Sequence, residues 1–187
     1  MYIGICGKQG SGKSTLSRKI LEELNDYIYI DIDKIGHQVN ELDEVKQELI
    51  KTFGEDILTD NKINRKLLGK KIFNNQENMN KLVDITWKYM EREIDRLIDD
   101  AKNVIFDWQL LPKVKYFKMC DLKILIDTPY EIREKRILKR DNISPKYLKS
   151  REESSIKYNK DDFDIVLPNN EIDIERVKMY EKSIISR

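Results

Sequence analysis

The fold of this chain is decided by the stretch Tyr2-Ile3-Gly4-Ile5-Cys6-Gly7-Lys8-Gln9-Gly10-Ser11-Gly12-Lys13-Ser14-Thr15. Its first five residues predict a short buried strand, and the residues from Gly7 onward match the pattern G-x-x-x-x-G-K-[ST]. Apolar residues at helical spacing follow directly, so the pattern lies where a strand passes into a helix. A glycine-rich turn that binds nothing needs neither the lysine nor the hydroxyl groups. The stretch therefore predicts a loop that wraps the phosphates of a nucleoside triphosphate.

The residue types of this loop each have a chemical reason. Glycines let the backbone turn its N–H groups inward, and the following helix adds the positive end of its dipole. Lys13 brings a full positive charge to the β- and γ-phosphates, and the hydroxyl of Ser14 is a ligand for Mg²⁺. The candidate ATP-binding residues of the loop are Gly7, Gly10, Ser11, Gly12, Lys13, Ser14 and Thr15.

The charge balance argues against a protein that coats nucleic acid. Lysine and arginine number 35 and aspartate and glutamate 34, which gives a formal net charge of +1, whereas such proteins are basic. No apolar run reaches the roughly 18 residues of a membrane helix, and no basic segment followed by an apolar one suggests a signal peptide. We therefore expect small-molecule partners, no nucleic acid, no membrane, and a cytoplasmic monomer or weak homo-oligomer.

The cysteine content favours a reducing compartment. Cys6 falls inside the first predicted strand and Cys120 just before another, so we expect two buried free thiols. With a single histidine and no close pair of cysteines, the sequence does not support a zinc site.

Strand-like and helix-like segments alternate along the chain. The predicted strands are 2–6, 27–31, 104–107, 122–127 and 163–167. The predicted helices are 13–24, 34–52, 64–73, 77–101, 129–140, one that starts at Ser144-Pro145, and 171–183. Such alternation predicts an α/β fold of the P-loop NTPase type, with a five-stranded parallel sheet flanked by helices. Ligands of these sheets lie at the C-terminal ends of the strands.

The length of 187 residues suits one domain, and the loop motif predicts that residues 1–187 form a P-loop domain. Its core is expected to comprise 1–33, 102–140 and 161–187. A helical insertion is expected close to 34–101, and a lid over the site close to 141–160.

Aspartates that follow predicted strands are the candidate acids. Asp31 and Asp33 are alternate residues that can point the same way, and phosphoryl transfer to a hydroxyl needs a carboxylate that takes its proton. Asp33 is the leading candidate for that base; the alternative is that one acid caps the next helix and the other is solvated. The run Val104-Ile105-Phe106-Asp107 is typical of a Walker B element, in which Asp107 would hold Mg²⁺ through water.

Arginines gather in the segment after the fourth predicted strand. Arg136 and Arg140 share one helix face, and guanidinium groups neutralise phosphate oxygens as a phosphoryl group moves. These two are expected to act from a lid on ATP, with Arg133 and Arg151 as weaker candidates. The alternative is a solvated basic helix.

Two further residues lie close to the candidate acids. His37 follows Asp33 by four residues, although a lone histidine is more often packed or capping than catalytic. Trp108 directly follows Asp107, so the alternatives are an ordinary core residue and a wall of the acceptor pocket.

These residues resemble the dephospho-CoA kinase family, within the nucleoside monophosphate kinase-like P-loop enzymes. The resemblance runs in order from the glycine-rich loop to Asn170. Residues 30–37 are similar to the family's D-A-D element with its Gly-His pair, and Arg136 with Arg140-Asp141 is similar to its R-x-x-x-R-D lid motif. Further similar elements are Phe53-Gly54, Ile63-Asn64-Arg65 and Val166-Leu167-Pro168-Asn169.

The resemblance implies transfer of the γ-phosphate of ATP, with Mg²⁺, to the ribose 3′-hydroxyl of dephospho-CoA. It implies that Asp33 is the base, that Lys13 and Arg140 act on the phosphates, and that Asn169 contacts adenine. It also places Arg65 on the acceptor side and implies a P-loop kinase domain whose insertion at 34–101 lies on that side. With the residues considered above, the candidate acceptor-binding residues are Asp31, His37, Arg65 and Trp108, and the candidate metal residues are Ser14 and, through water, Asp107.

Departures from the family pattern gather on the acceptor side. Trp87-Lys88 stands where the family has His-Pro, residues 109–113 read Gln-Leu-Leu-Pro-Lys where it has P-L-L-[FY]-E, and Ser155 stands where it has Gln. Two other hypotheses therefore stay open. One is a nucleoside or nucleoside monophosphate kinase with another small acceptor, and the other is a non-catalytic nucleotide-binding module.

Overall fold

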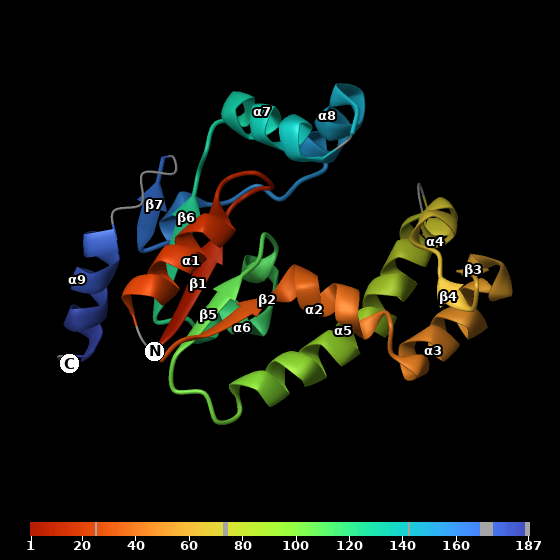
Figure 1. The fold of residues 1–187 in the computed structure, drawn as a ribbon, viewed down its shortest axis with the longest axis horizontal. Helices are drawn as coiled ribbons and strands as arrows, with labels where there is room; N and C mark the ends of the chain where they lie inside the picture. The colour runs from red at the N-terminus through yellow and green to blue at the C-terminus, as the bar shows by residue number, and fades with distance from the viewer. Residues whose placement is uncertain (25, 73–74, 142, 169–173, 186–187) are drawn as a thin grey trace. The chain divides into compact units, whose positions relative to one another are not determined.

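The computed structural model describes residues 1–24, 26–72, 75–141, 143–168 and 174–185, and it divides into two compact units (Figure 1). Met1–Ile30 and Ala101–Arg187 form the first, which we call the sheet unit. Asp31–Asp100 forms the second, which we call the inserted unit. The chain thus leaves the sheet unit once and returns to it once.

The central sheet has the predicted five strands, in the order β2-β5-β1-β6-β7. Their bounds are β1 Tyr2–Cys6, β2 Ile28–Asp31, β5 Val104–Asp107, β6 Leu122–Ile126 and β7 Ile165–Leu167. The central β1 pairs in parallel with β5 and β6, and β6 pairs in parallel with β7. The register sets Ile5 opposite Asp107, so the glycine-rich loop and Asp107 leave the sheet at the same edge. The predicted α/β fold with a parallel sheet is confirmed.

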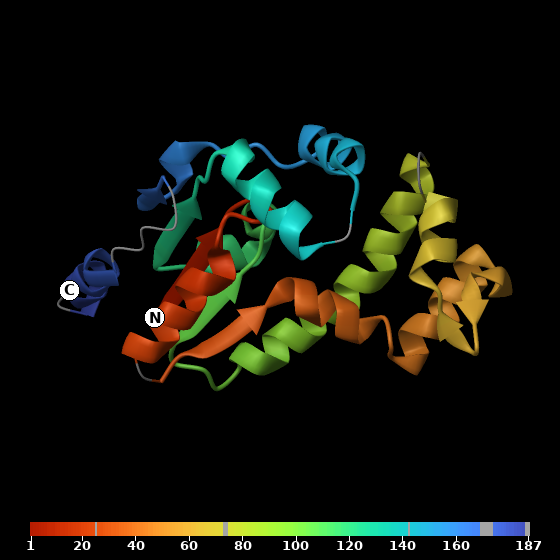
Figure 2. The ribbon, with the colours of Figure 1, turned by 45° about the horizontal axis from the view of Figure 1, so that its top comes forward.

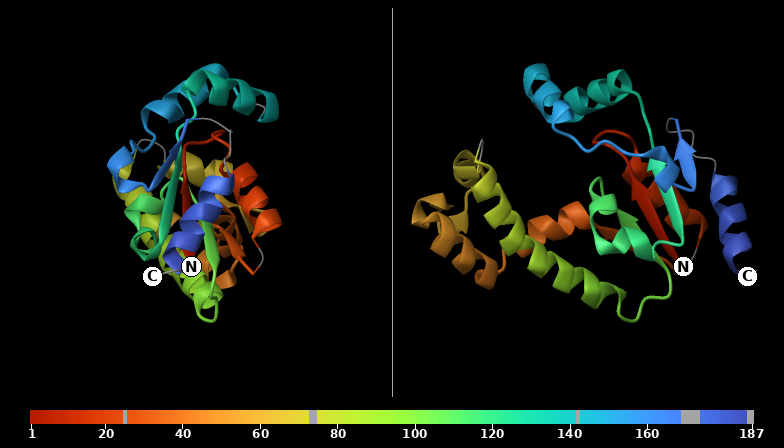
Figure 3. Two further views of the ribbon diagram at one scale, coloured as in Figure 1. Left: turned by 90° about the vertical axis from the view of Figure 1, so that its left-hand side faces the viewer. Right: turned by 180° about the vertical axis from the view of Figure 1, so that it is seen from behind.

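Two helices cover one face of this sheet. They are α1 (Lys13–Glu23) and α9 (Ile174–Ile185), which run alongside the strands in the left panel of Figure 3. Their apolar residues join alternate strand residues in one buried cluster that includes Ile3, Ile5, Leu16, Ile20, Ile105, Ile124 and Val177. Burial of these side chains is the main favourable term that holds the unit together.

The opposite face is covered by two short elements that follow β5. They are η2 (Leu111–Lys113) and α6 (Lys115–Met119), neither of which the sequence predicted. Gly4 of β1 faces them at close range, because a methyl group placed there would lie 2.8 Å from Sγ of Cys120 and 3.0 Å from Cδ2 of Leu111. A larger residue at this position of β1 would therefore displace the layer.

Two helices follow β6 at the edge where the loop lies (Figure 2). The first, α7, spans Tyr130–Arg140, and the second, α8, spans Pro145–Glu153. The predicted start of α8 is confirmed, because the hydroxyl of Ser144 accepts a hydrogen bond from the backbone N–H of Tyr147 at 3.2 Å. A 3-10 turn, η3 (Lys160–Asp162), then leads to β7.

The inserted unit is mainly helical. Its elements are α2 Ile32–Val39, α3 Asp43–Phe53, η1 Glu55–Ile57, β3 Leu58–Thr59, β4 Lys62–Ile63, α4 Arg65–Ile72 and α5 Gln76–Ile98. The long helix α5 contacts α2, α3 and α4. Glu48 of α3 accepts hydrogen bonds from Lys88 and Tyr89 of α5, at 2.6 and 2.7 Å. The unit therefore has a core of its own around α5.

The helix predicted over 34–52 is wrong, because the structure has two helices there. α2 ends at Val39 and α3 begins at Asp43, with a turn in which the N–H of Leu42 donates to the carbonyl of Val39 at 3.1 Å. The backbone leaves the helical region at Leu42, which has φ of −69° and ψ of 134°. Asp43 and Glu44 then place negative charge in the first turn of α3, which favours a new helix N-terminus at this point.

The hairpin of β3 and β4 also escaped prediction. Its turn residues Asp60 and Asn61 have φ of +49° and +61°, and aspartate and asparagine tolerate this region better than other non-glycine residues. The strands are two residues each, too short for a periodic pattern to reveal them.

Both cysteines are buried free thiols, as predicted. Burial raises the pKa of the Cys6 thiol far above its usual range and that of Cys120 to about 12. Among the described residues, no helix is long and apolar enough to cross a membrane.

We expect Gly4→Ala to destabilise the protein by about 1–3 kcal/mol, because the added methyl group overpacks the layer around Cys120. The matched control is Gly69→Ala in α4, where nothing lies within 4 Å of the new methyl group. That change should be neutral or stabilise by up to about 1 kcal/mol, since alanine favours a helix. Thermal melts of the two variants test the difference, and equal melting temperatures would contradict the close packing at Gly4.

Candidate active site

The glycine-rich loop between β1 and α1 runs closely against α7. Gly10 has a φ of +76°, and a methyl group there would lie 2.9 Å from Cγ1 of Ile137 and 3.1 Å from the carbonyl oxygen of Arg133. Gly12, with a φ of +107°, caps α1, which begins at Lys13. The positive end of the α1 dipole is therefore directed at the loop, an arrangement suited to bind phosphate.

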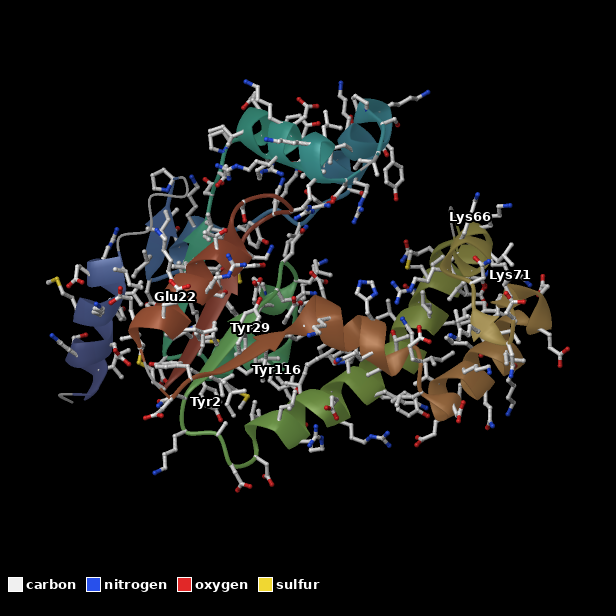
Figure 4. All side chains as sticks on the ribbon, in the orientation of Figure 1. Tyr2, Glu22, Tyr29, Lys66, Lys71 and Tyr116 are labelled. Atoms are coloured by element: carbon white, nitrogen blue, oxygen red, sulfur yellow. The ribbon has the colours of Figure 1, made fainter. Side chains whose placement is uncertain are left out.

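Asp107 is the buried acid of the site, with 4% of its surface exposed at the end of β5. Its Oδ2 accepts hydrogen bonds from the hydroxyls of Ser14, at 3.1 Å, and Tyr29, at 2.9 Å. The hydroxyl of Ser17 lies 3.5 Å from the same oxygen. Tyr29, labelled in Figure 4, reaches Asp107 from β2. These donors replace the water that burial removes from the carboxyl group, and they bring the two predicted metal residues together.

Helix α7 supplies two of the predicted arginines to the loop. The Nη1 of Arg136 donates to the carbonyl oxygen of Gly10 at 3.2 Å. Arg133, 4% exposed, donates from Nε to the carbonyl of Thr128 at 2.9 Å and from Nη1 to the carbonyl of Gln9 at 3.4 Å. Both arginines thus hold the loop through its backbone.

Glu152 of α8 also reaches the loop. The guanidinium of Arg133 binds both of its carboxylate oxygens, at 2.9 and 2.8 Å, and Nζ of Lys8 donates to its Oε1 at 2.7 Å. Hydrogen bonds from Arg133, with a further contribution from Lys8, hold the pKa of the Glu152 carboxyl below its usual range. The predicted lid is therefore tied to the loop by charge.

The other two arginines are exposed. Arg140 binds both oxygens of the neighbouring Asp141, at 2.7 and 2.8 Å, and so lowers the pKa of that carboxyl. Asp141 also accepts from Nε2 of Gln9 in the loop, at 3.0 Å. The guanidinium of Arg151 lies over the ring of Tyr147, 5.8 Å from its centroid.

The residues implied for the acceptor lie mostly in the inserted unit. Asp31 ends β2, and its carboxylate accepts from the backbone N–H of Lys34 at 2.9 Å, so it caps α2 as one of the two alternatives proposed. Asp33 and His37 are exposed on α2, and Arg65 is exposed at the start of α4.

The remaining predicted residues lie in the sheet unit or outside the description. Trp108 is half-buried directly after Asp107, and its backbone N–H donates to the carbonyl of Ile5 at 3.2 Å. Asn169, predicted to contact adenine, lies outside the described residues.

Several polar residues of the site were not predicted from the sequence. Ser17 carried a signal, because it lies one helical turn after Ser14. Tyr29, Glu152 and Tyr158 carried none. The hydroxyl of Tyr158 accepts from the backbone N–H of Gly7 at 3.2 Å and donates to the carbonyl of Gln109 at 2.8 Å, a bridge that only the folded chain reveals.

A parallel sheet whose central strand runs through this loop into α1, with a buried aspartate on the next strand, defines a P-loop nucleotide-binding protein. The family model for dephospho-CoA kinase matches residues 1–173. A dephospho-CoA kinase from Fusobacterium nucleatum is 34% identical over 183 residues, which cover 91% of this chain and 90% of the relative. The chain therefore belongs to the dephospho-CoA kinase family, and it is an ATP-dependent kinase.

Solved structures agree on the fold. A protein from Thermus thermophilus, TT1252, matches with a TM-score of 0.79 at 23% identity, over 100% of this chain and 96% of its own. A dephospho-CoA kinase from Campylobacter jejuni matches with a TM-score of 0.61 at 23% identity, over 98% of this chain and 94% of its own. These two proteins therefore share the fold of this chain although their sequences are only 23% identical to it.

We expect Gly10→Ala to raise the dissociation constant of ATP about tenfold, because a left-handed backbone costs a non-glycine residue about 1–2 kcal/mol. The new methyl group would also press on Ile137, so the loop backbone must move. Isothermal titration calorimetry measures the effect, with Gly69→Ala as the control. An unchanged affinity would mean that the loop does not need this conformation to bind ATP.

Proposed function

We propose that this protein transfers the γ-phosphate of ATP to the ribose 3′-hydroxyl of dephospho-CoA, a step of coenzyme A biosynthesis. Family membership over residues 1–173 carries the proposal, together with the loop that meets Asp107 through Ser14. The cytoplasmic location and the monomeric or weakly oligomeric state expected from the sequence accompany it as predictions.

On the donor side, the loop would bind the phosphates of ATP. Backbone N–H groups from Gly7 to Thr15 and the ammonium group of Lys13 suit a polyphosphate chain. Arg136 and Arg140 would add positive charge from α7, and Asn169 would contact adenine. Because the transition state of phosphoryl transfer gathers charge on the phosphate oxygens, cations held in place before the reaction lower its barrier.

The donor set beside the loop fits Mg²⁺. A serine hydroxyl and an aspartate carboxylate, 3.1 Å apart, are the hard oxygen donors that this ion prefers. Ser14 would ligate the ion directly, and Asp107 would hold its water shell. Held by these two residues, the ion would neutralise part of the charge on the phosphate oxygens.

On the acceptor side, Asp33 would accept the proton of the attacking hydroxyl. Asp31 already accepts a backbone N–H as the cap of α2, whereas Asp33 is the exposed acid of the pair. A base that orients the hydroxyl and takes its proton makes the oxygen a better nucleophile. Asp31, His37, Arg65 and Trp108 would then hold the acceptor.

The departures at Trp87, Gln109, Lys113 and Ser155 favour a second candidate function. Gln109 and Lys113 stand where the family pattern has proline and glutamate, so side chains in the segment after Trp108 differ from that pattern. An enzyme with the same donor side and a nucleoside or nucleoside monophosphate as acceptor is the second candidate. A non-catalytic nucleotide-binding module is the third.

A coupled assay of ADP release separates these candidates. With Mg²⁺ and ATP, we expect turnover with dephospho-CoA and none above background with a panel of nucleosides and nucleoside monophosphates. Turnover confined to another acceptor would favour the second candidate. Stabilisation by ATP without turnover on any acceptor would favour the third.

We expect Asp33→Asn to lower kcat by about a hundredfold or more, the usual size of a general-base effect, while the affinity for ATP stays near that of the wild type. Lys13→Ala should lower kcat and also weaken ATP binding, because the ammonium group interacts with the phosphates in the ground state and in the transition state. Asp84→Asn, an exposed change on α5, is the matched control and should retain full activity. A near-normal rate for Asp33→Asn would remove this residue from the role of base.

We expect Asp107→Asn to raise the Mg²⁺ concentration for half-maximal activity by about ten- to a hundredfold, since residues that hold a metal's outer shell contribute this much. The uncharged amide would attract the cation less than the carboxylate does. A titration of activity against Mg²⁺ at fixed ATP measures the change. An unaltered Mg²⁺ requirement would contradict the assignment of Asp107 to the metal.

A further inference from the structure

The chain between α8 and β7 contacts the first two residues of the glycine-rich loop. Glu152, in the last turn of α8, reaches Lys8, and Tyr158, six residues later, reaches Gly7. Two side chains of one short segment thus bind adjacent residues of the loop. All four lie in the sheet unit.

The contact of Glu152 is strong because a buried cation requires it. The side chain of Arg133 is 5% exposed, and Glu152 binds it in the bidentate arrangement that suits guanidinium and carboxylate. An arginine left unpaired at this burial would be costly, so the carboxylate is held firmly. Lys8 shares one carboxylate oxygen with Arg133, which connects the same acid to the loop.

The position of Arg133 does not depend on Glu152 alone. Its remaining donors bind the carbonyls of Thr128, just after β6, and Gln9, in the loop. The carbonyls of Thr128 and Gln9 therefore hold the guanidinium in place, and Glu152 docks α8 on it.

Tyr158 forms an anchor of a different chemical kind. Its hydroxyl accepts from the N–H of Gly7 and donates to the carbonyl of Gln109, so it satisfies two backbone groups at once. Its ring packs edge-on against Phe163, with 5.8 Å between ring centroids, and Phe163 packs against Phe117 at 5.4 Å. The segment is thus held at one end by charge and at the other by a neutral hydroxyl on an aromatic cluster.

We propose that Glu152 and Tyr158 are positioning residues that form a latch, which holds α8 and the following chain on the glycine-rich loop before ATP binds. The inference rests on the proposed role of residues 141–160 as the lid. ATP then meets a lid that is already docked, and little of its binding energy goes into ordering that segment. An apparent dissociation constant equals the intrinsic one divided by the competent fraction, so a latch that keeps this fraction near one keeps ATP binding tight.

The chain offers a matched control for the charged anchor. Glu153 is the next residue on α8 and is exposed, whereas Glu152 is half-buried against Arg133. Glu153→Gln makes the same chemical change as Glu152→Gln on the same helix. It should leave lid docking, ATP affinity and kcat unaltered.

The first experiment is hydrogen exchange of the whole chain without ATP or acceptor, followed in peptides that cover 148–158. Glu152→Gln should speed exchange there by about tenfold, because a hydrogen bond to a charged group is worth about that factor or more. Tyr158→Phe should speed it by about threefold, since a neutral hydrogen bond contributes less. Exchange in α1 and the sheet should stay at the wild-type rate in both variants.

The second experiment compares ATP affinity with turnover. The dissociation constant of ATP, measured by calorimetry, should rise in parallel with the loss of docking, by about tenfold in Glu152→Gln. kcat at saturating ATP should change little, because saturation restores the docked lid. A merely structural role would lower the melting temperature and change exchange throughout the sheet unit.

The outcomes are distinct. Wild-type exchange in both variants would overturn the latch, and faster exchange with unchanged ATP affinity would overturn its link to ATP. If Glu152→Gln fails to fold because Arg133 loses its partner, Tyr158→Phe decides the question, since it leaves every charge in place. Absence of wild-type turnover with dephospho-CoA would contradict the proposed function alone, because exchange and ATP affinity are measured without acceptor.

Discussion

The junction of the glycine-rich loop, the end of β6 and α8 depends on the buried guanidinium of Arg133. This group donates to the carbonyl of Thr128 after β6, to the carbonyl of Gln9 in the loop, and to the carboxylate of Glu152 on α8. Taking a cation out of water is costly unless each donor finds an acceptor of good geometry. Because one planar group binds all three acceptors, the end of a strand, the phosphate-binding loop and a distant helix are fixed to one another. Ile137, one turn further along α7, packs so closely against the loop that a side chain at position 10 would collide with it.

The proposed donor and acceptor residues divide between two separately packed cores. The loop, Asp107 and the arginines of α7 belong to the sheet unit, whereas Asp33, His37 and Arg65 belong to the inserted unit around α5. A substitution in one core can alter its side of the reaction without repacking the other. Departures from the family pattern occur in both units, at Trp87 in one and at Gln109 in the other, so the assay of acceptors bears on both.

The features that the sequence predicted correctly are those with a local pattern. Apolar runs marked the five strands of the central sheet, and the loop carried its own motif. The separation of α2 from α3 was missed because the apolar period continues through the turn in which Leu42 leaves the helical region. Within the site, Ser14 and Asp107 could be assigned to one metal from the loop motif and from the place of Asp107 at the end of a predicted strand. Tyr29, Glu152 and Tyr158 could not, because contacts between distant segments leave no periodic trace in either one.

The inserted unit joins the sheet through neighbouring strands. β2 leads into it and β5 follows it, and the two lie side by side, with the N–H of Ile28 donating to the carbonyl of Asn103 at 2.9 Å. Residues 31–100 therefore form a loop whose two ends are joined by the pairing of β2 with β5. The entropic cost of closing such a loop rises by only about 0.6 kcal/mol for each doubling of its length. Insertions or deletions within that segment would weigh little on the sheet's stability. The fold can thus exchange the inserted unit over evolution while the sheet unit stays as it is.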